Sequence, residues 1–295
     1  MVRLVRRRGA VLIGIGALHG ILLFAGDVVA VYGLLVVLFA VPLVATGPRP
    51  LWWIAGGGLL GVLVAGATEL LVVTGGVTVW DFVLSPTYPL ATWQRLIDWT
   101  LVGFAAQTVR VCASVAIGAL AARHRLLEDV GDHARLLRRA AVGGLLVAVV
   151  GGSPLALATV GGWEPGTGAV AVIGALHALT GYAGGAGYAA LAAVVVLALR
   201  DPQQPPRAGP LALGQRSLTA YLLHSVVFVL LFTRLHAGLG DDVGVAQASA
   251  IAVATWLVLL AGAVAMDRAG VRGPAEVALR WLTYGRRPGA RPVPG

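Results

Sequence analysis

The chain has 295 residues, of which 58% are hydrophobic and only 12% are charged, and its mean hydropathy is +0.86. Soluble domains hold about 25% charged residues, so this composition excludes a soluble protein and predicts an all-α polytopic membrane protein. The net charge of +9 comes from arginine without any lysine. Because the arginines lie beside apolar runs, they indicate membrane topology and argue against nucleic acid as a partner.

Eight apolar runs are long enough to cross a bilayer, which needs about 17 to 25 residues per helix. Their expected bounds are Gly9–Ala25, Val28–Val44, Leu51–Val73, Trp99–Ala121, Ala140–Val160, Gly168–Leu199, Ser217–Leu235 and Val245–Met266. With this count, 19 of the 22 arginines fall in segments on one side of the membrane. Because cytoplasmic loops collect arginine, the sequence predicts eight spans with both termini in the cytoplasm.

The first two runs form a predicted hairpin around the corner Ala25-Gly26-Asp27. His19 lies about ten residues into the first helix, which at ~1.5 Å per residue puts it near the middle of the membrane. Asp27 lies at the rim opposite the basic start of the chain. In one straight helix, the distance from His19 to Asp27 would be about 12 Å, which is too long for a direct bond.

The end of the chain has a different pattern. Pro274–Tyr284 places apolar side chains against Glu276 and Arg280 at helical spacing, which predicts a short amphipathic helix on the inner membrane surface. The residues after Gly285 are mostly Pro, Gly and Arg, which predicts disorder. We therefore expect one transmembrane domain over residues 1–285 and a disordered tail over residues 286–295.

Ionisable side chains inside apolar spans are costly, so they generally face the interior of a helix bundle and have a partner. Such side chains, with nearby tyrosines and Asp27, could form a polar path across the membrane: His19, Tyr32, Glu69, Arg110, His177, Tyr182, Tyr221 and His224. The alternative is structural, with Arg110 paired to Glu69 and each histidine bonded to a neighbouring helix. No cluster of residues has the spacing of metal ligands.

Three blocks resemble the YeiB-like bacterial membrane family, also called domain of unknown function 418. The first is RRRGAVLIGIGALHGILLFAGDVVAVYGLL, which matches through Arg8, Leu18, His19, Gly26, Asp27 and Tyr32. The second is GQRSLTAYLLHS (Gly214–Ser225), which matches through Gly214, Leu218, Thr219, Tyr221, Leu222, Leu223 and Ser225. The third is GPAEVALRWLTYG (Gly273–Gly285), which matches through Gly273, Pro274, Glu276, Arg280, Leu282, Thr283, Tyr284 and Gly285.

The sequence also departs from this family's pattern. Members usually begin with further helices that carry a Leu-Arg-Gly element, so we expect either a longer start or a shortened relative. In the second block, Gln215, Ala220 and His224 replace the family's Arg, Asn and Gln. Roles of those family residues therefore do not carry over to this chain.

The resemblance implies a distant relationship to transmembrane acyltransferases, which pass an acyl group from cytoplasmic acyl-CoA to a hydroxyl or amine at the outer face. A membrane-buried histidine is the usual catalytic group in such enzymes. On this reading His19 is the catalytic base or acyl carrier, and Asp27 orients the acceptor or caps the neighbouring helix. The substrate-binding candidates are Tyr32, Glu69, Arg110, His177, Arg216, Tyr221 and His224.

Among these candidates, Arg110 would hold phosphate or stabilise an oxyanion, and Arg216 would meet the CoA phosphates. The expected partners are the lipid bilayer, acyl-CoA as a co-substrate without any bound cofactor, and a sugar or lipid acceptor. A homodimer is left open. The implied location is the bacterial inner (cytoplasmic) membrane, which the chain would cross many times.

Two alternatives to an enzyme stay open. A transporter or permease would use the same polar path, with Glu69, Arg110 and His177 as a relay and the glycine-rich stretch Gly181–Gly187 as a bending point. An inactive shortened relative would act as a membrane scaffold.

Overall fold

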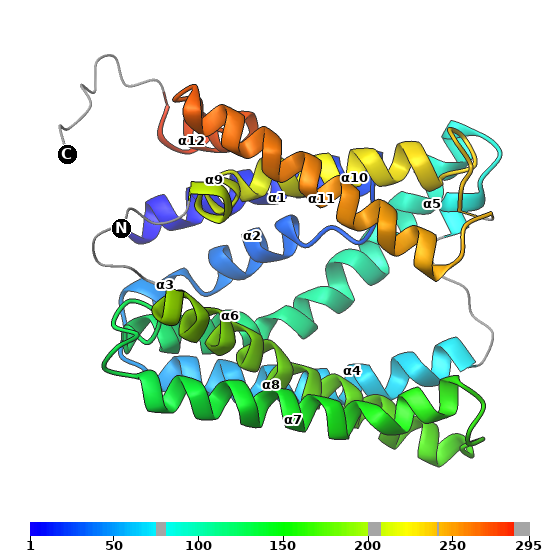
Figure 1. Ribbon diagram of the computed structural model, residues 1–295, viewed down its shortest axis with the longest axis horizontal. Coiled ribbons are helices and arrows are strands. Elements are labelled where there is room, and N and C mark those ends of the chain that lie inside the picture. The colour runs from blue at the N-terminus through cyan, green and yellow to red at the C-terminus, as the bar shows by residue number, and fades with distance from the viewer. Residues whose placement is uncertain (75–80, 200–207, 241, 286–295) are drawn as a thin grey trace. The chain divides into compact units, whose positions relative to one another are not determined.

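The structure is a computed structural model, and it describes residues 1–74, 81–199, 208–240 and 242–285 (Figure 1). Every regular element in these ranges is a helix, which confirms the predicted all-α class. The elements fall into two compact units: unit 1 comprises Met1–Leu38, Trp80–Phe104 and Pro205–Gly295, and unit 2 comprises Phe39–Val79 and Ala105–Gln204. The single-domain organisation stays a prediction, and the expected tail lies outside the described residues.

Unit 1 is built on the hairpin of α1 (Val2–Leu22) and α2 (Val29–Leu38). Its other elements are η1 (Asp81–Leu84), α5 (Tyr88–Asp98), most of the π-helix η2 (Trp99–Ala106), α9 (Ala208–Gln215), α10 (Ser217–Phe232), α11 (Val245–Arg268) and α12 (Pro274–Tyr284). Helix α1 packs against α2, α5 and α12, and α10 packs against α9, α11 and α12 (Figure 1).

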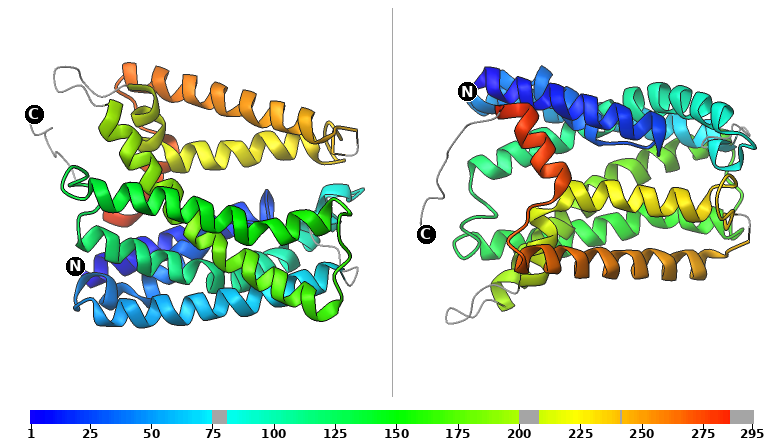
Figure 2. Two further views of the ribbon diagram at one scale, coloured as in Figure 1. Left: turned by 60° about the horizontal axis from the view of Figure 1, so that its bottom comes forward. Right: turned by 90° about the horizontal axis from the view of Figure 1, so that it is seen from above.

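Unit 2 contains α3 (Ala40–Val44), α4 (Arg49–Thr74), α6 (Gln107–Arg123), α7 (Ala134–Thr159) and α8 (Thr167–Leu199). Helix α7 packs along α8, and α4 packs against both α8 and α6 (Figure 2). Leu137, Ala141 and Ala190 form a buried cluster where α7 meets α8. The guanidinium of Arg123 donates to the carbonyl of Pro42 at 2.6 Å, which ties the end of α6 to α3.

Within the described residues, five helical runs are long and apolar enough to cross a membrane: Arg49–Thr68, Tyr88–Arg123, Ala134–Thr159, Thr167–Leu199 and Val245–Arg268. A sixth is obtained if α9 and α10, which meet at a bend of 85°, are counted as one broken span. These runs identify a polytopic membrane protein. Helices α1 and α2 occupy the first two predicted spans, but α1 begins with several arginines and α2 has only 10 residues.

The second and fourth predicted spans differ from the observed helices. The second is broken at Phe39, whose φ of −98° and ψ of 16° leave the helical region. Pro42 follows closely and has no N–H to bond the carbonyl of Leu38, so the helix cannot continue unchanged. The fourth begins earlier than expected, because α5, η2 and α6 form one helical run of 36 residues from Tyr88 to Arg123.

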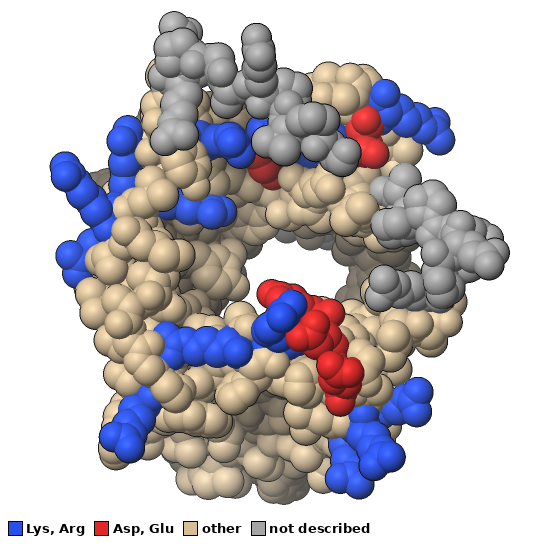
Figure 3. All heavy atoms as spheres, turned by 90° about the vertical axis from the view of Figure 1, so that its left-hand side faces the viewer, with Lys and Arg blue, Asp and Glu red and all other residues tan. Residues whose placement is uncertain are grey.

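The predicted amphipathic helix is present as α12, with the expected bounds Pro274–Tyr284. Leu279 and Thr283 are buried in unit 1, whereas Val277 and Trp281 are about half exposed. Its position on a membrane surface stays a prediction. Arg7 of α1 donates to the carbonyl of Leu282 at 3.1 Å, which holds α12 beside the basic start of α1. Arginine side chains are prominent at this end of the helices (Figure 3).

Candidate functional site

His19 and Asp27 are bonded directly, with Nδ1 of His19 lying 2.8 Å from Oδ1 of Asp27. Helix α1 ends at Leu22, and the chain turns back within residues 23–28, so the separation expected for a straight helix does not apply. Both residues are buried, with exposed fractions of 4% for His19 and 0% for Asp27. Two of the predicted site residues therefore form a buried pair.

Asp27 also caps the second helix of the hairpin. Its Oδ2 accepts the backbone N–H of Ala30 at 2.8 Å, near the start of α2. A carboxylate at a helix N-terminus satisfies an otherwise unbonded N–H group and interacts favourably with the helix dipole. Gly16 of α1 faces this corner, and a Cβ there would collide with Asp27 and with the backbone of Ala30. Asp27 thus caps α2, whereas its expected role in orienting the acceptor stays a prediction.

Tyr221 of α10 completes this cluster. Its ring centroid lies 5.1 Å from that of His19, and its hydroxyl accepts the backbone N–H of Val28 at 3.4 Å. The hydroxyl also interacts with the carboxylate of Asp27. Tyr32 lies on α2, the second helix of the hairpin, and its side chain is 44% exposed. The carboxylate is thus surrounded by an imidazole, a helix N-terminus and a phenol. We name His19, Asp27 and Tyr221 the corner cluster.

The second ring nitrogen of His19 is chemically distinct from the first. Nε2 is buried and has no hydrogen-bond partner among the described residues. An ionised carboxylate only accepts hydrogen bonds, so the bond to Asp27 puts the ring proton on Nδ1 and leaves the lone pair on Nε2. A histidine held in this way can accept a proton from a substrate, and the carboxylate stabilises the imidazolium that forms.

The second and third sequence blocks meet beside the corner cluster. Oε1 of Glu276 accepts the N–H groups of Leu218 and Thr219 at 2.8 and 3.1 Å, at the start of α10. The hydroxyl of Thr219 donates to Oε2 of Glu276 at 2.5 Å and accepts the N–H of Ala275 at 3.0 Å, at the start of α12. Each helix therefore supplies a side chain that caps the other.

Gly273, the residue before α12, explains how closely these helix starts approach. A Cβ at this position would collide with the Glu276 carboxylate and with the Thr219 hydroxyl. The three blocks thus converge in unit 1, because His19 touches Tyr221 of the second block and Arg7 bonds Leu282 of the third. The sequence alone did not reveal these contacts.

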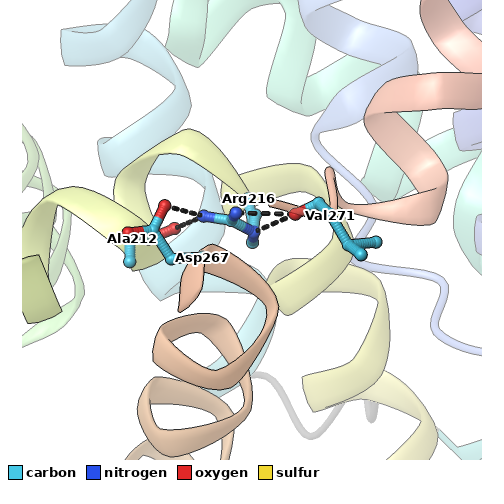
Figure 4. A network of polar contacts seen from close by, with 4 residues as sticks. All are labelled: Ala212, Arg216, Asp267 and Val271. Atoms are coloured by element: carbon cyan, nitrogen blue, oxygen red, sulfur yellow. Dashed lines mark hydrogen bonds and ion pairs between the residues drawn. The ribbon is translucent and has the colours of Figure 1, made fainter. Parts of the chain in front are cut away.

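Arg216 holds the break between α9 and α10 (Figure 4). Its Nη1 donates to the carbonyl of Ala212 at 3.1 Å and to Oδ1 of Asp267 at 3.2 Å. Its Nε and Nη2 both donate to the carbonyl of Val271, at 3.2 and 2.6 Å. The residue is only 5% exposed, so its guanidinium serves the fold. The expected contact with CoA phosphates stays a prediction.

The remaining candidates are not members of the corner cluster. His224 of α10 bonds the carbonyl of Ala220 in its own helix, with Nδ1 2.9 Å from the oxygen. Arg110 lies on α6 and His177 on α8, both in unit 2. The side chain of Glu69 lies outside the described residues, so its predicted pairing with Arg110 stays a prediction. Within the described part of the chain, no group of three or more side chains could hold a metal ion.

Arg95 of α5 is a residue whose importance the sequence analysis missed. It is only 5% exposed, and its Nε donates to the carbonyl of Ile21 at 3.0 Å, at the end of α1. Its Nη2 donates to Oγ1 of Thr92 at 3.1 Å, and its guanidinium lies 5.6 Å from the ring centre of Phe82. The available signal was that Arg95 is one of the three arginines outside the predicted cytoplasmic segments, with Arg110 and Arg234.

Comparison with known protein families gives a match over the second half of the chain. The family model described as "Protein of unknown function (DUF418)" matches residues 121–286. This range contains the second and third sequence blocks, whereas His19 and Asp27 lie before it. No curated protein and no solved structure matches the chain.

Proposed function

The chain belongs to the DUF418 family, whose model covers more than half of it, and we propose that this member is a membrane acyltransferase. It would move an acyl group from cytoplasmic acyl-CoA to a hydroxyl or amine of a sugar or lipid acceptor at the outer face. The observation that carries this proposal is the buried bond between His19 and Asp27, with Nε2 of His19 left as a base.

The chemistry needs one proton acceptor near the acceptor hydroxyl. Nε2 of His19 takes the hydroxyl proton while the oxygen attacks the carbonyl carbon of the thioester. The tetrahedral intermediate collapses with cleavage of the C–S bond, and the CoA thiolate receives the proton from the imidazolium. The acyl ester and free CoA are the products, and His19 returns to its neutral form. Asp27 keeps the imidazole in the correct tautomer throughout.

The membrane topology is part of the same proposal. Eight spans with both termini in the cytoplasm, in a bacterial inner membrane, would put the start of α1 and α12 at the inner face. The bond between Arg7 and Leu282 supports this arrangement, because it places two arginine-bearing segments together. His19 lies 12 residues after Arg7, which is about 18 Å along the helix axis and within the hydrocarbon layer.

The test uses purified protein in lipid nanodiscs. Free CoA released from acetyl-, succinyl- and longer acyl-CoA would be followed for the wild type and for His19→Ala. We expect release, or transfer of a labelled acyl group, that disappears in the variant. His124→Ala is a matched control, because His124 is exposed in the turn after α6. If the wild type neither binds nor consumes any acyl-CoA, the proposal fails.

One observation favours a transporter as the second candidate. Helices α9 and α10 meet at 85°, and the bend is at Arg216, close in sequence to Tyr221 of the corner cluster. Broken helices form the substrate and ion sites of many transporters. In that case the His19 and Asp27 pair would carry a proton, and a pH gradient across proteoliposomes would dissipate faster with the wild type than with His19→Ala.

A further inference from the structure

A small pocket of about 170 Å³ lies in unit 1 where α1 ends. Its walls come from the last turn of α1, from α5 and from the second half of α10 and the residues after it. The described lining is aliphatic apart from four polar residues, which are Tyr88, Arg95, Thr233 and His236. The volume is about that of five or six water molecules, at ~30 Å³ each, so the pocket fits a small chemical group.

Arg95 places a positive charge in the wall of this mostly aliphatic pocket. Its guanidinium is buried, and among the described residues no carboxylate forms an ion pair with it. Nε and Nη2 have partners, but no bond from Nη1 to another described residue is present. The carbonyl of Ile21 and the ring of Phe82 compensate the charge only in part. A buried cation is stable when paired, so the wall of this pocket suits an anion.

The other three polar residues satisfy one another. The hydroxyl of Thr233 donates to the carbonyl of Val229 at 2.7 Å, so it accepts from Nδ1 of His236 at 2.8 Å. The neutral ring of His236 then accepts at Nε2 from the hydroxyl of Tyr88, at 2.9 Å. This chain of bonds brings no negative charge to the pocket. Arg95 is therefore the one charged group among the described lining residues.

The pocket adjoins the corner cluster. Leu22 and Leu23, which line it, follow His19 by three and four residues and so lie on the same face of α1, about 5 Å further along the axis. On α10, Tyr221 contacts His19, while Val226 and Val229 line the pocket. A molecule bound in the pocket would thus lie about one helical turn from the imidazole of His19.

We propose that this pocket binds a carboxylate or phosphate group through the guanidinium of Arg95, and that this group belongs to the acyl acceptor. The identification as the acceptor rests on the proposed function, whereas the anion site itself does not. The bound group would orient the acceptor so that its hydroxyl or amine faces His19. The acceptor class is accordingly an anionic one, such as an acidic sugar or a phosphate-bearing lipid headgroup.

The experiment measures anion binding without acyl-CoA. Wild-type protein in zwitterionic nanodiscs would be titrated by calorimetry with inorganic phosphate and, separately, with propionate, at constant ionic strength. We expect saturable binding of at least one of the two anions and a loss of at least tenfold in affinity for Arg95→Gln. Arg234→Gln is the matched control. Arg234 is exposed and does not line the pocket, so this substitution removes the same charge from a position outside the pocket. Binding of phosphate alone or of propionate alone identifies which anionic group the acceptor carries.

Two further variants keep the result interpretable. Val226→Phe fills the pocket while leaving Arg95 intact, and we expect it to abolish binding even if Arg95→Gln folds poorly. His19→Ala should bind the anion as the wild type does, so failure of catalysis and failure of the anion site are separate outcomes. The proposal is overturned if neither anion binds saturably, or if Val226→Phe binds as tightly as the wild type.

Discussion

Thr219 and Glu276 are 57 residues apart in the chain, and each caps the N-terminus of the helix that carries the other. Both come from sequence blocks that resemble the family. The contact joins the last helix of unit 1 to α10, whose first turns also carry Tyr221. Capping at this point therefore fixes the position of a member of the corner cluster as well as the ends of two helices.

Replacing Glu276 with alanine is expected to destabilise unit 1. The change leaves the N–H groups of Leu218 and Thr219 without their acceptor, and loss of such a cap costs about 1 to 2 kcal/mol. Hydrogen exchange should show faster exchange of these two amides than of amides in the middle of α10. Glu128→Ala is the control, because Glu128 is exposed and pairs with Arg125, which is also exposed. Unchanged amide exchange at the start of α10 would contradict the capping role.

Gly273→Ala should lower thermal stability because the added Cβ collides with Glu276 and Thr219. A forced rearrangement of this kind typically costs about 1 to 3 kcal/mol. Gly185→Ala is the control. A Cβ at this position of α8 would meet no atom within 4 Å, and alanine is more favourable than glycine in a helix by about 1 kcal/mol. Thermal unfolding in detergent should therefore shift down for the first variant and not for the second. Equal shifts for both would mean that close packing at Gly273 is not important.

Asp27→Asn is expected to reduce acyl transfer much more than it reduces folding. The amide can still accept the N–H of Ala30, but it no longer stabilises an imidazolium at His19. In a comparable triad the same substitution lowers kcat about 10⁴-fold. The check is the CoA-release assay together with the thermal unfolding temperature. A variant with wild-type turnover would show that Asp27 acts only as a helix cap.

Arg216 and Asp267 should respond unequally to substitution, although they form an ion pair. Arg216→Met removes donors from the carbonyls of Ala212 and Val271, and leaving the buried Ala212 acceptor without this bond costs about 1 to 3 kcal/mol. Asp267 has a side chain that is 41% exposed, so Asp267→Asn should cost at most about 1 kcal/mol. Thermal unfolding of the two variants checks this order. A larger drop in unfolding temperature for Asp267→Asn than for Arg216→Met would show that the ion pair matters more than the bonds from Arg216 to the carbonyls (Figure 4).

The sequence predicted the positions of the helices better than the contacts between them. Helix α12 has the expected bounds because Pro274 favours a helix start and Gly285, at a φ of 74°, favours a helix end. The bond between His19 and Asp27 was not predicted, because it depends on how the chain turns back within residues 23–28, and the corner Ala25-Gly26-Asp27 alone does not determine which side chains meet there. The pairing of Thr219 with Glu276 requires packing of distant segments, which helical periodicity does not encode.

The bend between α9 and α10 and the burial of Arg95 were not predicted for the same reason, because both depend on contacts with distant segments. The bend at Arg216 depends on the Asp267 carboxylate and the Val271 carbonyl, which follow Arg216 by more than 50 residues in the chain. An arginine in an outer segment is usually solvated, so nothing local indicated that Arg95 is buried against the end of α1. The membrane class, in contrast, follows from composition alone. With 58% hydrophobic and 12% charged residues, the chain would expose a large apolar surface to water if it folded as a soluble protein.

The cap that Glu276 provides has a consequence for the order of events during synthesis. A ribosome adds about 5 to 20 residues per second, so the start of α10 is made roughly 3 to 11 seconds before Glu276. During that interval the N–H groups of Leu218 and Thr219 do not have the Glu276 carboxylate as their acceptor. A nascent chain arrested before Pro274 would therefore contain every predicted span and still leave the helix that carries Tyr221 with a frayed first turn.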